Sequence, residues 1–184
     1  MKLLIVLGSV RKGRAGKRVA DWFVKEVEKD GRFEVDVVDL KELNLSYELP
    51  EVSAGSVRDS EYDNEEDRRW AKQVNEADAM VFIMPEYNHG YPASLKNAID
   101  HLYHEWNGKP ASFVGYGSAG APFAIGAFGL VAAWVHLDIV NAHVGISEIW
   151  SAFDEEGNLI HQDYHSYETK TMLDALTVKV EKNK

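Results

Sequence analysis

A basic, glycine-rich segment follows the first apolar run of the sequence. Residues 8–18 read GSVRKGRAGKR, in which the last eight positions hold five cations and no acid. Helical spacing begins near Ala15, and the start of a helix offers free N–H groups and a positive dipole to an anion. The small residues among them let the backbone approach a ligand closely. The segment therefore predicts a phosphate-binding loop, whereas a solvated basic turn would leave the glycines unexplained.

The kind of phosphate is limited by what the loop lacks. Gly8 and Gly13 have the spacing of an NTP-binding P-loop, but Arg14 and Ala15 stand where that motif has Lys followed by Ser or Thr. Without the hydroxyl, the magnesium ligand of an NTPase is missing. The sequence therefore favours a terminal phosphate monoester bound without a metal, and no metal site is predicted.

A second polar segment ends the apolar run at residues 79–84. Pro85 cannot donate a ladder hydrogen bond and so ends a strand, and Pro92 suits the first turn of a helix. Between them the sequence EYNHGY offers backbone amides, the carboxamide of Asn88 and the flexible Gly90. These groups suit a flat heteroaromatic ring with donors and acceptors on its edge. The alternative is a plain strand-to-helix loop whose tyrosines only pack.

A third segment, GYGSAGAP, follows the strand expected at residues 111–116. Its glycines at 115, 117 and 120 match the dinucleotide-binding spacing, but no acid stands about 20 residues further on, at the end of the next strand. We interpret Gly117 and Ser118 as a second edge of the same ring site. A Rossmann-type NAD site is the minority interpretation.

Strands and helices alternate along the chain and must position these segments. Strand patterns occur at 3–7, 33–40, 79–84, 111–116 and 142–149, and helix patterns at 15–29, within 59–75, at 92–103, 123–137 and 164–180. This alternation predicts one α/β domain, residues 1–184, with a parallel sheet. In doubly wound sheets, ligands bind beyond the carboxyl ends of the strands, so the three segments should meet there. Residues 44–64 form either a flap over that site or a mobile acidic surface loop.

Composition excludes several classes of protein. The chain has no cysteine, which removes disulfides, zinc ribbons and thiolate catalysis. A net charge of −10 argues against nucleic acid or an acidic membrane as partner. The apolar stretch at residues 122–137 is shorter than the roughly 20 residues of a membrane-spanning helix. The first apolar run is too short for a signal peptide, so we expect a cytoplasmic protein.

Taken together, the motifs resemble the NADPH-dependent FMN reductase family, which has a flavodoxin-like fold. The resemblance rests on GSVRKGRAG at 8–16, PEYNHGYPASLKNAID at 85–100 and GYGSAGA at 115–121, with EWNGKP at 105–110 also similar. It implies a three-layer sandwich, in which a five-stranded parallel sheet of order 2-1-3-4-5 has helices on both faces. It also implies FMN as cofactor and NADPH or NADH as hydride donor.

The resemblance assigns the cofactor to particular residues. The phosphate would lie near Ser9, Arg11, Arg14 and Gly16, and the isoalloxazine against Pro85, Glu86, Tyr87 and Asn88, with Gly117 and Ser118 beside its pyrimidine edge. Many family members have Ser or Thr and Asn in the later half of the phosphate loop, where this chain has Arg14, Gly16 and Lys17. Charge and backbone would then hold the phosphate, with either Arg14 or Lys17 in contact.

The cofactor supplies the chemistry in this interpretation. FMN takes a hydride at N5 and passes electrons to a quinone, azo compound, free flavin or metal oxyanion, so no side-chain nucleophile is needed. His89 is the one candidate for a proton donor, against the alternative of a loop histidine bonded to backbone. His101 and His104 are expected on a solvated or interface face. The other functions considered are a flavodoxin-type electron carrier and a Rossmann-like NAD module.

The helix expected at 123–137 indicates an oligomer. Within residues 122–137, His136 is the only ionisable residue. A helix that is apolar all round must be buried all round, and in a monomer its outer face would be a large exposed apolar patch. We therefore predict a homodimer, or a tetramer, that pairs this helix and the helix at 92–103, as in the family.

Overall fold

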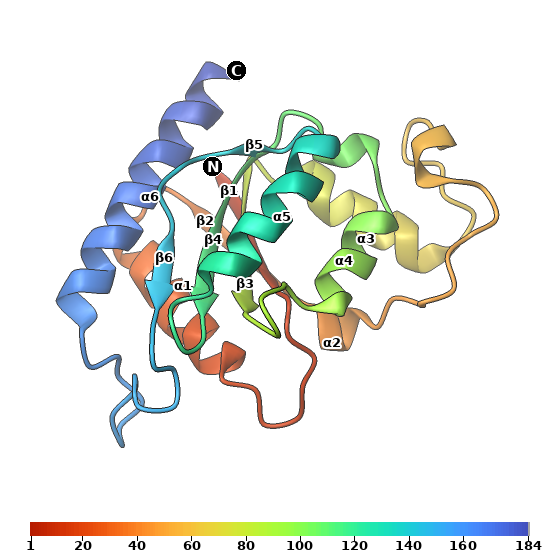
Figure 1. The fold of residues 1–184 in the computed structure, drawn as a ribbon. Coiled ribbons are helices and arrows are strands. Elements are labelled where there is room, and N and C mark those ends of the chain that lie inside the picture. The colour runs from red at the N-terminus through yellow and green to blue at the C-terminus, as the bar shows by residue number, and fades with distance from the viewer. Residues whose placement is uncertain (184) are drawn as a thin grey trace.

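The computed structural model describes residues 1–183, which form one six-stranded parallel sheet (Figure 1). The strands are β1 (Lys2–Leu7), β2 (Glu34–Asp39), β3 (Ala79–Pro85), β4 (Pro110–Tyr116), β5 (Asp138–Ile139) and β6 (Val144–Ile146). Their order is β2-β1-β3-β4-β5, and β6 also pairs with β4. The predicted flavodoxin-like fold and strand order are confirmed.

Helices cover both faces of the sheet, as predicted. They are α1 (Gly16–Asp30), α2 (Leu40–Leu43), α3 (Glu65–Glu76), α4 (Ala93–Asp100), α5 (Pro122–Trp134) and α6 (Gln162–Lys182), with short 3-10 helices η1 (Ala54–Ser56) and η2 (His104–Trp106). Along β1, Leu4 and Val6 pack in the core with α3, α4 and α5, whereas Leu3 and Ile5 pack in the core with α1 and α6. This alternation is that of a strand buried on both faces.

The fifth strand position differs from the expected single strand at 142–149. It is filled by two short strands: β5 pairs with the start of β4, and β6 pairs with its end. Between them the Ser112 hydroxyl donates to the carbonyl of Ala142 at 2.6 Å. A side chain of β4 thus satisfies a backbone group at the gap between the two strands.

The helix expected at 92–103 ends early, at Asp100. The N–H groups of His101 and Leu102 still bond back to Asn97 and Ile99, but the N–H of Tyr103 donates to the Glu105 carboxylate at 3.3 Å. Glu105 is buried and also accepts from the hydroxyls of residues 60 and 62, at 2.6 and 2.9 Å. This carboxylate replaces the next helical bond, so the chain turns into η2.

Residues 44–64 run along the flank formed by α3 and α4, and appear in orange in Figure 1. The carbonyl of Ser46 accepts from Asn97 Nδ2 at 3.0 Å and lies 2.8 Å from His101 Nε2. Only the start of the segment reaches the carboxyl edge of the sheet, where Tyr47 lines a small cavity with Val10. The segment thus runs mainly beside α3 and α4, with its start at that edge.

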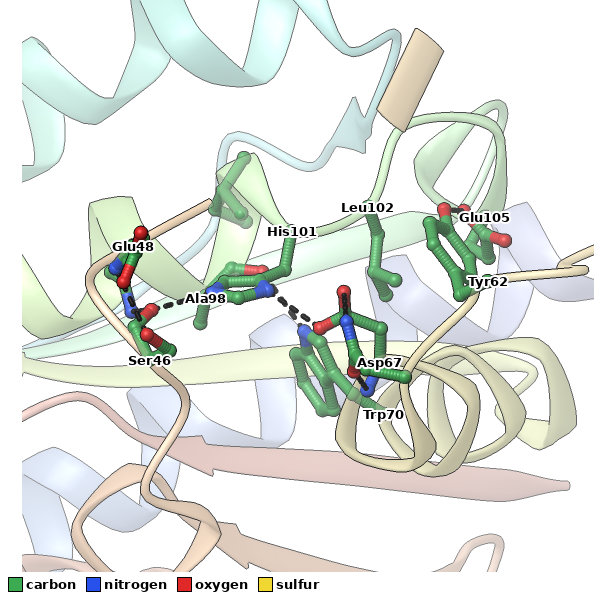
Figure 2. Close-up of polar contacts among 12 residues, drawn as sticks. Ser46, Glu48, Tyr62, Asp67, Trp70, Ala98, His101, Leu102 and Glu105 are labelled. Atoms are coloured by element: carbon green, nitrogen blue, oxygen red, sulfur yellow. Dashed lines mark hydrogen bonds and ion pairs between the residues drawn. The ribbon is translucent and has the colours of Figure 1, made fainter. Parts of the chain in front are cut away.

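His101 is buried, contrary to the solvated or interface face expected for it. Figure 2 shows its ring between Asp67 and Ser46: Nδ1 lies 2.5 Å from the Asp67 carboxylate, and Nε2 faces the Ser46 carbonyl. Both ring nitrogens therefore face an oxygen that can accept a hydrogen bond. Asp67 is itself fully buried, and its other oxygen accepts from Asn64 at 2.6 Å. This pair ties residues 44–64 to α3 and α4.

Replacing His101 by Gln should therefore destabilise the fold. The substitution removes the ring that faces the buried Asp67 carboxylate and the Ser46 carbonyl, and leaving buried polar groups without a partner costs about 1–3 kcal/mol of unfolding free energy. Urea denaturation at neutral pH measures this loss. The control is His143→Gln, because His143 is exposed and should change stability by no more than about 0.5 kcal/mol. Equal effects of the two substitutions would contradict a stabilising buried hydrogen bond at His101.

Candidate active site

The three segments singled out in the sequence meet at the carboxyl edge of the sheet. The first and second are joined because Gly8 N–H donates to Ile83 at 2.9 Å and the hydroxyls of Ser9 and Tyr87 lie 2.8 Å apart. The second and third are joined because Glu86 N–H donates to Tyr116 at 3.2 Å. Hydrogen bonds thus connect the loops after β1, β3 and β4 into one surface.

Arg14 lies inside the first loop and is already paired. Its guanidinium forms a two-pronged ion pair with the Asp39 carboxylate at the end of β2, with Nη1 and Oδ1 2.6 Å apart, and it also donates to the carbonyl of Ser9. Arg14 therefore fastens the loop after β1 to the end of β2. Asp39 carries no sequence signal beyond its place at the end of a strand that reaches the same edge.

The other cations of this segment face outward. Lys17 is exposed on α1 and lies 3.6 Å from Asp21, and Arg18 lies over the ring of Phe153 at 5.2 Å. Arg11 is exposed within the loop. Of the two candidates left open by the sequence, Arg14 is the one built into the loop, and Lys17 is turned to the solvent-exposed side of α1.

The segment after β3 is a tight hairpin turn. Tyr87 and Gly90 exchange backbone hydrogen bonds of 2.8 and 3.0 Å, and Asn88 and His89 between them have φ of 50° and 61°. Two left-handed residues in a two-residue turn define type I′. The turn exposes Asn88 and His89 at its tip, and His89 stacks on Phe123 with ring centroids 4.2 Å apart.

Glu86 caps α5 with its side chain. Its Oε2 accepts from the N–H groups of Phe123 and Ala124, at 2.9 and 3.1 Å, while Ala121 at the N-cap position has no side-chain oxygen of its own. The backbone N–H groups of Glu86 and Tyr87 are also engaged within the protein. Of the backbone amides expected to face a ring, the N–H groups of Glu86 and Tyr87 are thus already used by the sheet and the turn.

The glycines after β4 are explained by close packing. A Cβ on Gly115 would lie 2.4 Å from the carbonyl of Gly120, and one on Gly120, whose φ is 76°, would lie 3.0 Å from Gly145. Gly117 differs, since its Cβ would meet only Glu86, at an ordinary contact distance of 3.8 Å. The spacing that matches a dinucleotide motif is therefore needed for this loop to fold back on β4 and β6.

Tyr116, the last residue of β4, is a site residue that the sequence analysis missed. It is 4% exposed, and its hydroxyl lies 2.6 Å from where a Cβ on Gly16 would stand. Burial raises the pKa of this hydroxyl well above its usual range. A tyrosine ending an apolar strand looks like a core residue in sequence, and only the fold shows that its tip reaches the start of α1.

The described chain lacks two other features. Residues 1–183 contain no group of three or more His, Asp or Glu side chains that could hold a metal ion. None of the helices in that range is both long and apolar enough to cross a membrane.

Comparison with known proteins assigns the chain to a family. Residues 1–151 match the family model described as NADPH-dependent FMN reductase. An NAD(P)H-dependent FMN reductase of Schizosaccharomyces pombe is 41% identical over 119 residues, which is 65% of this chain and 59% of that protein. A 2-hydroxy-1,4-benzoquinone reductase of a Burkholderia species is 28% identical over 91% of this chain and 90% of that protein.

Comparison with solved structures agrees with this family assignment. The structure of FerB, a flavoenzyme NAD(P)H:(acceptor) oxidoreductase from Paracoccus denitrificans, superposes with a TM-score of 0.74 at 25% identity, covering 98% of this chain and 97% of that one. The family match includes all three loops of the candidate site. The chain therefore belongs to the NADPH-dependent FMN reductase family, an enzyme family whose cofactors are FMN and NADPH, as the sequence motifs predicted.

Proposed function

We propose that this chain is an FMN-containing oxidoreductase that takes a hydride from NADPH or NADH and passes electrons to a quinone or a similar small acceptor, such as an azo compound or free flavin. The observation that carries the proposal is the meeting of the loops after β1, β3 and β4 at one edge of the sheet, linked by the Ser9–Tyr87 and Glu86–Tyr116 hydrogen bonds. The relatives named for FMN and quinone reduction support it. A cytoplasmic location remains part of the proposal.

The first loop fits the phosphate of FMN. Helix α1 starts at Gly16 with no side-chain cap on Ala15 in the described chain and no acid in its first turn, so its N–H groups and dipole are available to an anion. Gly13 has φ of 66° and open space around it. We assign the phosphate to Ser9, Gly16 and Arg11, with Arg14 holding the loop through Asp39; Lys17 contributes charge from outside.

The second and third loops fit the ring. We assign one side of the ring to Pro85, Glu86, Tyr87 and Asn88 at the turn after β3, and the other side to Gly117 and Ser118. Glu86 contributes by fixing the start of α5 rather than by touching the ring. When bound, FMN supplies the hydride acceptor, and the chain's own residues bind, orient and shield it. A flavodoxin-type electron carrier, which binds FMN without nicotinamide turnover, is the alternative.

The proposal predicts a yellow protein that NADPH or NADH bleaches. Purified protein should show flavin absorbance, lose it when either nicotinamide is added without oxygen, and regain it when a benzoquinone is added. Absorbance spectra in an anaerobic cuvette follow both steps. Flavin that nicotinamide cannot reduce would favour the electron carrier, and a colourless protein that binds NAD would favour the Rossmann-like module.

His89 is the side chain that could protonate a reduced acceptor, and its position permits a direct test. The ring is exposed beside the candidate site but stacked on Phe123, an arrangement that packing alone explains. We expect His89→Gln to leave quinone turnover within about twofold of the unmodified protein across the pH range, because a packing role needs no proton. A turnover that falls steeply and loses a pH-dependent limb would instead make His89 the acid.

Helix α5 carries an apolar surface that supports the proposed homodimer. Phe123, Leu130 and Trp134 recur at helical spacing and are 56%, 80% and 74% exposed, while the opposite face packs in the core. Neighbouring large apolar side chains on one exposed face are typical of an interface. We propose that α5 pairs across a two-fold axis together with residues 92–103; a tetramer formed from such dimers is the other possibility.

The double substitution Leu130→Glu with Trp134→Glu should produce a monomer. Charges placed on both chains at this face would be buried unpaired or repel one another. Sedimentation at micromolar concentration should show a dimer for the unmodified protein and half its mass for the variant. The matched control, Val178→Glu on α6, changes an exposed apolar residue elsewhere and should stay dimeric. An unmodified protein that sediments as a monomer would contradict the proposed homodimer.

A further inference from the structure

The hydroxyl of Tyr116 is a buried polar group without a hydrogen-bond partner among residues 1–183. The side chain is only 4% exposed, at the last position of β4. A buried hydroxyl left unpaired costs about 1–3 kcal/mol, so such groups in folded proteins usually have a use. Phenylalanine at this position would fill the core equally well without that cost.

The position of this hydroxyl is the start of α1. It lies against Gly16, the first residue of the helix, where an added Cβ would stand 2.6 Å from the oxygen. The Ser9 hydroxyl, the Gly16 backbone and the charge of Arg14 lie near enough to influence it, although none meets the geometry of a hydrogen bond. Three hydroxyls, those of Ser9, Tyr87 and Tyr116, therefore gather at an uncapped helix N-terminus.

The protonation state of the Tyr116 hydroxyl allows it to donate a hydrogen bond to an anion. Burial raises the pKa of Tyr116, so the group keeps its proton and can donate. The nearest guanidinium, that of Arg14, is already paired with the Asp39 carboxylate, which reduces the positive charge that the loop offers. The neutral Tyr116 hydroxyl would therefore add a hydrogen bond to a bound phosphate, to which the paired Arg14 contributes less.

We propose that the Tyr116 hydroxyl donates a hydrogen bond to the terminal phosphate of FMN and makes this chain select FMN over riboflavin, which lacks that phosphate. The inference rests on the proposed function, since it assigns a further ligand in the same site. Because the hydroxyl is buried, a neighbour must move for the phosphate to reach it. Tyr87, 37% exposed and next to a two-residue turn, is the neighbour with room to do so.

Binding of FMN and riboflavin to the flavin-free protein tests this proposal. Tyr116→Phe removes one oxygen and keeps the ring, so the Kd for FMN should rise roughly tenfold or more, as for loss of a hydrogen bond to a charged group, while the Kd for riboflavin stays within about twofold. Quenching of flavin fluorescence gives both constants. The control, Tyr167→Phe on the exposed side of α6, should change neither.

Two further outcomes separate this role from a structural one. The flavin-free Tyr116→Phe protein should melt at the same temperature as the unmodified protein or higher, because an unpaired hydroxyl has been removed. If its melting temperature falls, or if FMN and riboflavin weaken together, the hydroxyl is structural and the proposal is wrong. If the unmodified protein itself binds no FMN, the proposed function fails instead.

Gly16→Ala checks where the hydroxyl lies. The added Cβ would overlap the Tyr116 oxygen, but the next nearest ring atom stands 3.4 Å away. The single substitution should therefore lower the melting temperature, and the pair Gly16→Ala with Tyr116→Phe should recover it without recovering tight FMN binding. A pair as unstable as Gly16→Ala alone would show that the hydroxyl is not beside Gly16, which overturns the proposal.

Discussion

A parallel sheet buried on both faces is the constraint on which the rest of this structure depends. Every residue of β3 and β4 is buried, so the chain can present polar groups to a ligand only where these strands end. The loops beyond those ends must also satisfy their own backbone, and here they do so partly through one another: Gly8 donates to Ile83 and Glu86 to Tyr116. The candidate site is thus held by the same hydrogen bonds that finish the sheet.

Among the helices that begin at this edge, α1 and α5 have N-termini that differ in charge. Helix α5 is occupied by the Glu86 carboxylate, which accepts from its first N–H groups, so a pyrophosphate at that end would meet a negative charge. Helix α1 has neither a cap in the described chain nor an acid in its first turn. This contrast argues against a dinucleotide site at residues 115–120 and in favour of a phosphate at Gly16. An overall charge of −10 is compatible with an anion at this loop, since residues 8–18 hold five cations and no acid.

Periodicity predicted the alternation of strands and helices, because most elements are long enough to show their buried face. The failures lie where a side-chain hydrogen bond decides the local structure. Glu105 ends the helix expected to reach residue 103, Ser112 bonds at the gap in the fifth strand position, and Asp67 draws His101 into the core across 34 positions of sequence. At the site, the loops could be predicted, but Asp39 and Tyr116 could not. Each reads as an ordinary strand end until the fold brings it beside Arg14 or Gly16.

The proposed dimer face and the candidate site are continuous through one residue. Phe123 donates its N–H to Glu86, stacks on His89 and is the first exposed apolar residue of α5. A partner chain packed on Leu130 and Trp134 would therefore extend to the rim formed by the turn after β3. That turn is only two residues long, and Asn88 and His89 in it have strained left-handed backbone conformations. How far the turn can move would therefore depend on whether a partner chain packs against it. Pairing of two chains would then limit the size and shape of any acceptor that enters beside the ring, even though every cofactor contact proposed above comes from one chain.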